Sequence, residues 1–225
     1  MDKVSRRSMV GLTAVLGIGL AGCAKDDGSA SETPTPEASS ETPTSETSPS
    51  ADVVESGPPL LVEVEPRSID GETVEIAPGA SMTLPPDLGS LPDDGSSPRR
   101  ARYYAASDDF GLLAVDTSAF RVDAPGMAAR GEWEASKSQV TTLSALVETT
   151  WPGAEYAWTW TWTQTADAAV FDPDGRASGT VTVDGAALLM RTTTGQDLYI
   201  AAFAPQGTLE ESTPLAALES LTISS

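Results

Sequence analysis

The groups available for chemistry in this chain of 225 residues are carboxylates and hydroxyls, with one thiol and no imidazole. Because the sequence has no histidine, it cannot form a Ser/His/Asp or Cys/His catalytic arrangement or a histidine-based zinc site. Cys23 is the single cysteine, so no intramolecular disulfide can form. The role of this thiol must therefore be inferred from the residues around it.

The single cysteine follows a segment with the layout of an export signal. Lys3, Arg6 and Arg7 form a positive N-terminal region, and an uncharged stretch from Met9 to Ala21 follows. That stretch is shorter than the roughly 20 apolar residues that span a bilayer, and it has the length of a signal-peptide core. The pattern predicts a signal peptide over residues 1–22.

The residues Leu20-Ala21-Gly22-Cys23 resemble the lipobox of bacterial lipoproteins at all four positions. The resemblance implies cleavage between Gly22 and Cys23 and a diacylglyceryl group on the Cys23 thiol. Two acyl chains give stable anchoring, so we expect attachment to the extracytoplasmic face of the cell membrane. Residues 5–10, Ser-Arg-Arg-Ser-Met-Val, also resemble the twin-arginine motif and favour that export route, with the general secretory route as the alternative.

Residues 23–57 are dominated by serine, threonine, proline and glutamate. Such a segment cannot bury enough apolar area to offset the entropy of ordering it, so we expect a disordered linker. Its Thr-Pro pairs are typical of spacers, either unmodified or carrying O-linked sugar. Residues 58–225 have a globular composition and are predicted to form a single domain.

The chain has 33 acidic and 13 basic residues, a net charge of −20. So negative a surface repels nucleic acid and anionic head groups, which excludes nucleic-acid binding. The expected partners are the membrane, through the anchor, and an envelope protein or ligand of unknown identity.

Hydrophobic periodicity predicts an α+β fold in which an antiparallel meander is packed by one long and one short helix. Strands are expected over 60–65 and 73–84 (broken at Pro78-Gly79), and as a hairpin over 102–106 and 110–116. Apolar residues at three- and four-residue steps predict the long helix over 132–151. A strand over 155–163, an extended segment over 168–171, a hairpin turning at Asp184-Gly185 and a strand over 198–204 follow. Thr213 is expected to cap the final helix, with Pro214 at its first position.

The same region resembles the Mog1/PsbP-like fold, which includes the LpqN-type lipoproteins of actinobacteria. The resemblance rests on the strand ending in Leu84-Pro85-Pro86, the central helix, the strand 199–205 and the closing residues 218–223. It implies a domain that serves in scaffolding or in binding proteins and ligands.

Two groups of side chains are candidates for a ligand or partner surface. Trp158, Trp160 and Trp162 share one face of a strand, where they form either a stacking platform or part of the core. Arg99, Arg100 and Arg102 form a basic spot on an acidic domain, either a binding site for an acidic partner or a solvated loop end. Asp172-x-Asp174-Gly175 resembles the start of a calcium loop but lacks its further ligands, so a β-turn is expected and no metal site is predicted.

No residue is predicted to be catalytic, and no cofactor is expected. The leading hypothesis is a non-enzymatic binding or accessory module of the cell envelope. The alternatives are a carrier with an apolar cavity between sheet and helices, and a carboxylate-based envelope hydrolase with two carboxyl groups about 5–10 Å apart.

Overall fold

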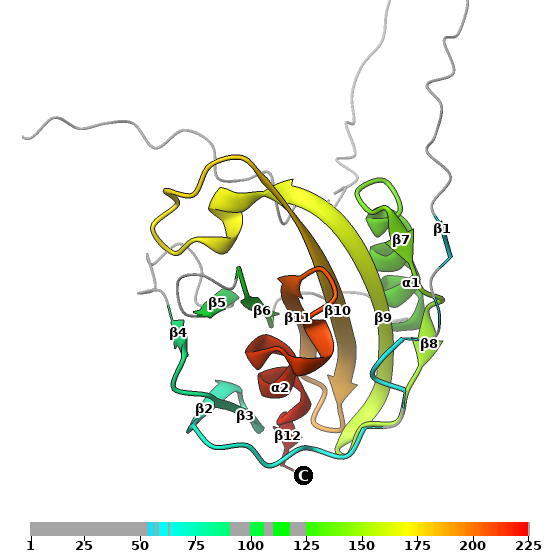
Figure 1. Cartoon of the computed structure of the whole chain (residues 1–225). Helices are drawn as coiled ribbons and strands as arrows, with labels where there is room; N and C mark the ends of the chain where they lie inside the picture. The colour runs from blue at the N-terminus through cyan, green and yellow to red at the C-terminus, as the bar shows by residue number, and fades with distance from the viewer. Residues whose placement is uncertain are drawn as a thin grey trace, which may run out of the picture.

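The computed structural model describes residues 54–55, 57, 59–62, 64–90, 100–105, 110–117 and 125–224. The predicted signal peptide, Gly22, Cys23, nearly all of the linker and Arg99 lie outside the described residues. The described part confirms an α+β architecture built on a mainly antiparallel sheet with two α-helices (Figure 1).

The described part of the chain contains twelve strands, two α-helices and two 3-10 helices. The first half contains the strands β1 (Val54–Glu55), β2 (Glu72–Ala77), β3 (Ala80–Leu84), β4 (Leu88–Ser90), β5 (Arg100–Ala105) and β6 (Leu112–Asp116). The second half contains α1 (Pro125–Ser136), β7 (Thr142–Leu143), β8 (Val147–Glu148), β9 (Ala154–Asp167), the 3-10 helix η1 (Ala168–Phe171), β10 (Thr180–Thr192), β11 (Asp197–Pro205), the 3-10 helix η2 (Leu209–Glu211), α2 (Thr213–Glu219) and β12 (Thr222–Ile223).

Among the described residues, nine strands form the main sheet in the order β1-β7-β9-β10-β11-β6-β5-β4, with β8 also paired to β9. The two-residue β1–β7 pair is parallel, and the other pairs of this sheet are antiparallel. A second sheet has the order β12-β3-β2. The break predicted at Pro78-Gly79 is confirmed, and the two halves pair as a β2–β3 hairpin, in whose turn Gly79 has a φ of 76° that favours glycine. The predicted β5–β6 hairpin is also confirmed.

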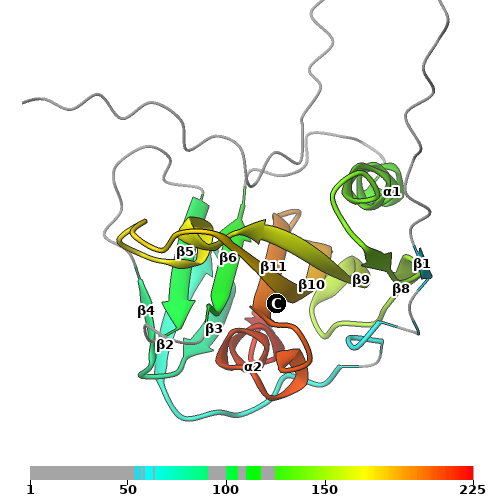
Figure 2. The ribbon, with the colours of Figure 1, turned by 45° about the horizontal axis from the view of Figure 1, so that its top comes forward.

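The main sheet is apolar on both faces, because both sets of alternating side chains are buried. We call the face that packs on α2 and the small sheet the α2 face; its core includes Leu188, Met190 and Ile200. The opposite face, which packs on α1 and η1, is called the α1 face, and its core includes Trp160 and Leu189. The helices α1 and α2 therefore lie on opposite sides of the sheet (Figures 1 and 2). Each fully buried large side chain contributes roughly 1.5–3 kcal/mol to folding.

The predicted helix over 132–151 is wrong in its bounds. The helix ends at Ser136, and the chain after it forms the short strands β7 and β8 along β9. A helix through this region would place Trp133 and Trp151 on one side of one element. Instead, Trp133 packs on the α1 face and donates from Nε1 to the Ser144 carbonyl at 2.9 Å, whereas Trp151 is buried on the α2 face and donates to Leu221 at 3.1 Å. The threonines and valines of 140–150 favour strands, and pairing with β9 outweighs the helical spacing.

The predicted hairpin at Asp184-Gly185 is also wrong, because β10 runs through both residues without a break. Gly185 lies directly opposite Trp162 of β9. A Cβ atom at Gly185 would come within 2.5 Å of the Trp162 ring atoms Cε2 and Cζ2. The glycine therefore allows an indole to lie against the backbone, and it marks a close approach rather than a turn.

Three smaller predictions are corrected as well. Residues 60–65 form no strand where they are described, although Leu61 is fully buried. Residues 168–171 form the 3-10 helix η1, capped by the Asp167 carboxylate, rather than an extended segment. The N-cap of α2 is Ser212, one residue before the predicted Thr213, and its hydroxyl accepts from the backbone N–H of Leu215.

Candidate functional site

The three tryptophans of β9 lie on the α1 face, and they do not form an open platform. Trp160 is completely buried and Trp162 is 7% exposed, whereas Trp158 is half-buried. Trp160 packs beside Tyr199 with ring centroids 6.1 Å apart, and Trp162 meets Phe203 edge-on at 5.4 Å. Trp160 therefore belongs to the core rather than to a stacking platform, whereas Trp162, although buried, also contributes to the lining of a groove.

The outer end of this aromatic row is accessible. Tyr156 is 39% exposed and stacks on Trp158, with ring centroids 5.8 Å apart and planes inclined by 17°. On the neighbouring strand, the register places Arg191 opposite Tyr156, and the Arg191 Nε donates to Asp197 at 2.7 Å. Along β9, the aromatic side chains thus change from the exposed Tyr156 to the fully buried Trp160.

The predicted basic spot is only partly described. Arg100 and Arg102 both lie on β5, where the backbone register places them opposite Asp116 and Ala114. The Arg102 side chain is half-buried. The described residues therefore place two of the three arginines on a paired strand rather than on a solvated loop.

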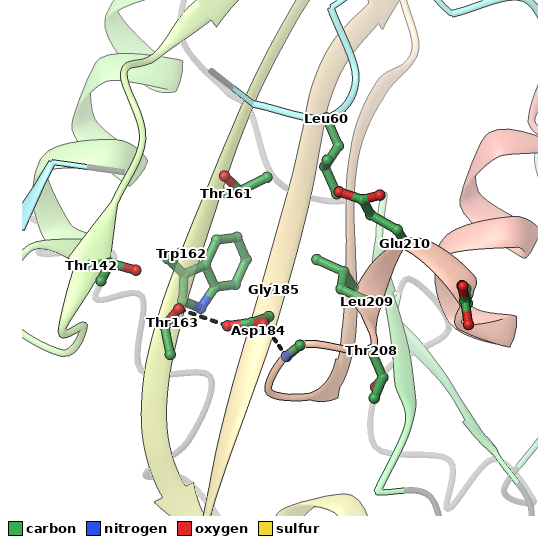
Figure 3. Close-up of a pocket in the computed structure, with 12 residues that line it drawn as sticks. Leu60, Thr142, Thr161, Trp162, Thr163, Asp184, Gly185, Thr208, Leu209 and Glu210 are labelled. Atoms are coloured by element: carbon green, nitrogen blue, oxygen red, sulfur yellow. Dashed lines mark hydrogen bonds between the residues drawn. The ribbon is translucent and has the colours of Figure 1, made fainter. Parts of the chain in front are cut away.

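A groove with a volume of about 500 Å³ lies on the α2 face (Figure 3). Its lining comes from β7, β9, β10, the turn 207–208 and η2, together with one residue of the N-terminal segment. The lining residues are Leu60, Thr142, Thr161, Trp162, Thr163, Asp184, Gly185, Gly207, Thr208, Leu209, Glu210 and Glu211. The lining thus combines carboxylates, threonine hydroxyls and two leucines, with no lysine or arginine.

Asp184 lies in the lining of the groove and connects β9 with the turn at Gly207. Thr163 donates from Oγ1 to one carboxylate oxygen at 2.6 Å, and the backbone N–H of Gly207 donates to the other at 2.6 Å (Figure 3). These contacts hold the 207–211 turn against the sheet. Glu210 and Glu211 lie exposed on η2, so the groove lining combines one carboxylate held by hydrogen bonds with two exposed carboxylates.

A second polar cluster lies on the α1 face, beneath the helix. Burial and the nearby negative charge of Asp116 raise the pKa of Glu132 to about 7. Burial, followed by the charges of Glu132 and Asp116, raises the pKa of the Tyr199 hydroxyl well above its usual range. This cluster can hold a proton near neutral pH.

The Asp172 turn has a structural role. Its carboxylate oxygens accept hydrogen bonds from the backbone N–H groups of Asp174, Arg176 and Ala177 at 2.7–2.9 Å. These bonds and the nearby Arg176 lower the pKa of Asp172. The β-turn prediction is confirmed. Within the described residues, no group of three or more potential ligands is arranged to hold a metal ion.

Apart from Trp162, the residues of the groove and of the Glu132 cluster were not singled out by the sequence. Asp184 was assigned to a turn, and Glu132 to the beginning of a helix. Two features of the sequence could have indicated them. Glu132 is an acidic residue next to Trp133 in a helix, and Asp184-Gly185 interrupts an otherwise apolar strand. In the described part, no helix has the length and apolar character needed to cross a membrane.

Comparison with known proteins finds no matching family model and no similar curated protein. Similar solved structures include the Ran-binding protein Mog1p of Saccharomyces cerevisiae, at 16% identity over 69% of this chain and 96% of that chain, with a TM-score of 0.44. A mutant of the protein Mog1 is 17% identical over 69% and 97% of the two chains, with a TM-score of 0.43. LpqN of Mycobacterium tuberculosis, involved in cell envelope biogenesis, is 15% identical over 73% and 89%, with a TM-score of 0.33. The similar structures thus include Mog1 and LpqN, the two proteins after which the resembling family was named in the sequence analysis. At these TM-scores the similarity carries no functional inference.

Proposed function

We propose that this chain is a lipid-anchored, extracytoplasmic binding module that holds a positively charged ligand in its groove and is not an enzyme. The observation that carries the proposal is the groove of about 500 Å³ with three carboxylates and no basic residue in its lining. Charge complementarity of this kind selects the partner and speeds the encounter. The net charge of −20 over the whole chain acts in the same direction.

The rest of the lining matches a basic peptide segment. Leu60 and Leu209 offer apolar contacts for the aliphatic stems of lysine or arginine, and the threonine hydroxyls can pair with peptide N–H and C=O groups. Glu210 and Glu211 lie at the surface, where they can meet the charged ends of those side chains. A basic segment of an envelope protein is therefore the ligand class that we propose.

The hydrogen bonds of Asp184 favour binding over catalysis. A general acid or base must reach the proton that it transfers. Both oxygens of the Asp184 carboxylate already accept hydrogen bonds from the fold, which makes this residue a structural support. The carrier alternative requires a largely apolar cavity, whereas this groove is rimmed by carboxylates, so the lining favours a charged ligand over a lipid.

The proposed anchor rests on the sequence Leu20-Ala21-Gly22-Cys23. Replacing the thiol by a hydroxyl in Cys23→Ser removes the group that would be lipidated. We expect the full chain to incorporate labelled fatty acid and to sediment with membranes, and the variant to do neither. Equal fatty-acid labelling of both chains would contradict the anchor.

The groove is tested with a fluorescent decapeptide of arginine, leucine and serine, and with a matched peptide in which glutamate replaces arginine. We expect the full chain to bind the basic peptide only, more weakly as salt is added. The double variant Glu210→Gln/Glu211→Gln should weaken binding by at least about tenfold, which corresponds to about 1.4 kcal/mol.

The matched control is Glu72→Gln/Glu75→Gln, which removes the same charge from exposed positions on β2, an element that does not line the groove. This variant should bind as the native chain does. If both double variants lost the same affinity, binding would depend on overall charge, and the groove assignment would be wrong.

A further inference from the structure

Two buried polar atoms of the described residues lack a hydrogen-bond partner, and both lie on the α1 face. They are Oε2 of Glu132 and Nε1 of Trp160. Trp160 has no exposed surface. A buried polar atom without a partner destabilises the arrangement that buries it, and the effect is larger for a charged group than for a neutral one. The packing of α1 on the sheet therefore depends on the protonation of Glu132.

Charged groups of both signs share the face on which Glu132 lies. Asp116 ends β6, and Tyr199 lies opposite it on β11. Both are coupled electrostatically to Glu132. Three arginines of the sheet lie on this face by register: Arg100 on β5 is directly opposite Asp116, Arg102 on β5 is opposite Ala114, and Arg191 on β10 is bound to Asp197.

The helix itself carries Arg130, which is exposed, and Glu134, which pairs with Lys137 at 2.9 Å. Neither group contributes to the raised pKa of Glu132, whose causes are burial and Asp116. Ionising Glu132 thus places a second negative charge beside Asp116 in a poorly solvated layer.

The two ends of α1 are held differently. Near its C-terminal end, Trp133 donates to the Ser144 carbonyl at 2.9 Å, and the Lys137 ammonium lies 3.9 Å from the Trp133 ring centroid. Toward its N-terminal end, Gly126 approaches the Trp158 ring, while Met127 is 75% exposed. The helix also contains Gly126 and Gly131, and glycine is a poor helix former.

We propose that α1 is a proton-controlled cover over the aromatic row of β9, packed on it when Glu132 is neutral and released when Glu132 is ionised. Release lets the carboxylate, which directly precedes Trp133 in the helix, reach water. Asp116 and Tyr199 cannot move in the same way, because they belong to paired strands of the sheet. Release exposes Trp158 and Trp160 next to the accessible Tyr156, and so produces an aromatic surface above neutral pH. This inference does not depend on the groove.

The test is hydrogen exchange of the full chain in detergent, followed by mass spectrometry of peptides covering 125–136. Rates are corrected for the intrinsic effect of pH. Between about pH 5.5 and about pH 8.5, we expect the protection of the amides in α1 to fall by at least about tenfold, with a midpoint near the pKa of Glu132. Peptides from β10 and β11 should keep their protection.

Glu132→Gln is the decisive variant, because glutamine has nearly the same shape and no charge. We expect it to keep α1 protected over the whole pH range. Glu134→Gln is the matched control on the same helix, and it should show the native transition. A pH-independent native chain, or a Glu132→Gln variant that opens as the native chain does, would overturn the proposal.

A second variant keeps the test valid if Glu132→Gln does not fold. Asp116→Asn removes the charge that, after burial, raises the Glu132 pKa, so ionising Glu132 should disturb the closed helix less. The loss of protection should then be smaller and should level off at lower pH. Acrylamide quenching of tryptophan fluorescence, compared with Trp158→Phe to assign the signal, should change in the same way. An unchanged transition in Asp116→Asn would count against the proposed cover.

Discussion

Replacing Gly185 by alanine introduces one methyl group at the point where Trp162 lies against β10. The new Cβ would lie 2.5 Å from Cε2 and Cζ2 of the indole and 3.0 Å from Nε1. Non-bonded carbon atoms prefer about 3.5–4.0 Å, so the ring or the strand would have to retreat by about 1 Å. Trp162 is held between this glycine, Trp160 at 6.5 Å and Phe203 at 5.4 Å, so the ring has little room to move.

The expected magnitude is the difference between two effects. Forcing an extra methyl group into a packed core destabilises by about 1–3 kcal/mol. Alanine also lowers the conformational entropy of the unfolded chain, which stabilises the folded state by about 0.4–1 kcal/mol. We therefore expect Gly185→Ala to lower the free energy of unfolding by about 1–2 kcal/mol, and Tm by about 2–8 °C for a domain of this size.

Thermal and urea unfolding followed by near-ultraviolet circular dichroism measure this effect. Gly89→Ala is the matched control, because Gly89 also lies in a strand and no atom approaches its Cβ position within 4 Å. It should leave stability unchanged or slightly higher. In the Trp162→Leu background, where the smaller side chain leaves space for the methyl group, Gly185→Ala should lose most of its effect.

A stable Gly185→Ala variant would refute the close approach of Trp162 to the backbone. It would also reopen the interpretation of Asp184-Gly185 as a turn. A destabilisation that persists in full in the Trp162→Leu background would assign the effect to the backbone of β10 instead of to the ring.

Three further predictions concern protonation and helix capping. The Glu132 pKa is raised from 4.5 to about 7, so its folded form favours the proton and stability falls as pH rises through this window. The loss in free energy of unfolding from this pKa shift is at most about 3 kcal/mol, and partial exposure of Glu132 reduces it to about 1–2 kcal/mol. Urea unfolding should show Glu132→Gln more stable than the native chain at about pH 8 and equal to it below about pH 4.5. The Asp172 pKa is lowered, so its turn is stabilised above the usual carboxylate range and loses this support as pH falls through the folded pKa. Asp172→Ala should therefore make the turn sensitive to proteolysis at neutral pH, as the native chain becomes only in acid. Ser212→Ala removes the cap of α2 and should cost about 1 kcal/mol in thermal unfolding.

Local patterns determined much of the fold correctly. The break between β2 and β3, the β5–β6 hairpin, the tryptophan-bearing strand and the final short helix were all predicted from alternation, turn residues and Pro214. These features depend on interactions between residues near one another in the chain, which a sequence pattern records directly. The proposed export and anchoring also depend on a local pattern, the residues that end in Cys23.

Tertiary structure decided the points at which two patterns competed. Residues 140–150 carry helical spacing and strand-forming residue types, and the long edge of β9 determines which of them prevails. Asp184-Gly185 has the composition of a turn, yet the ring of Trp162, far away in sequence, requires the glycine inside a strand. The groove and the Glu132 cluster also depend on contacts between distant segments. The sequence determined which local elements could form, and packing across the sheet decided where the helix ended, which tryptophans were buried and which carboxylates came together.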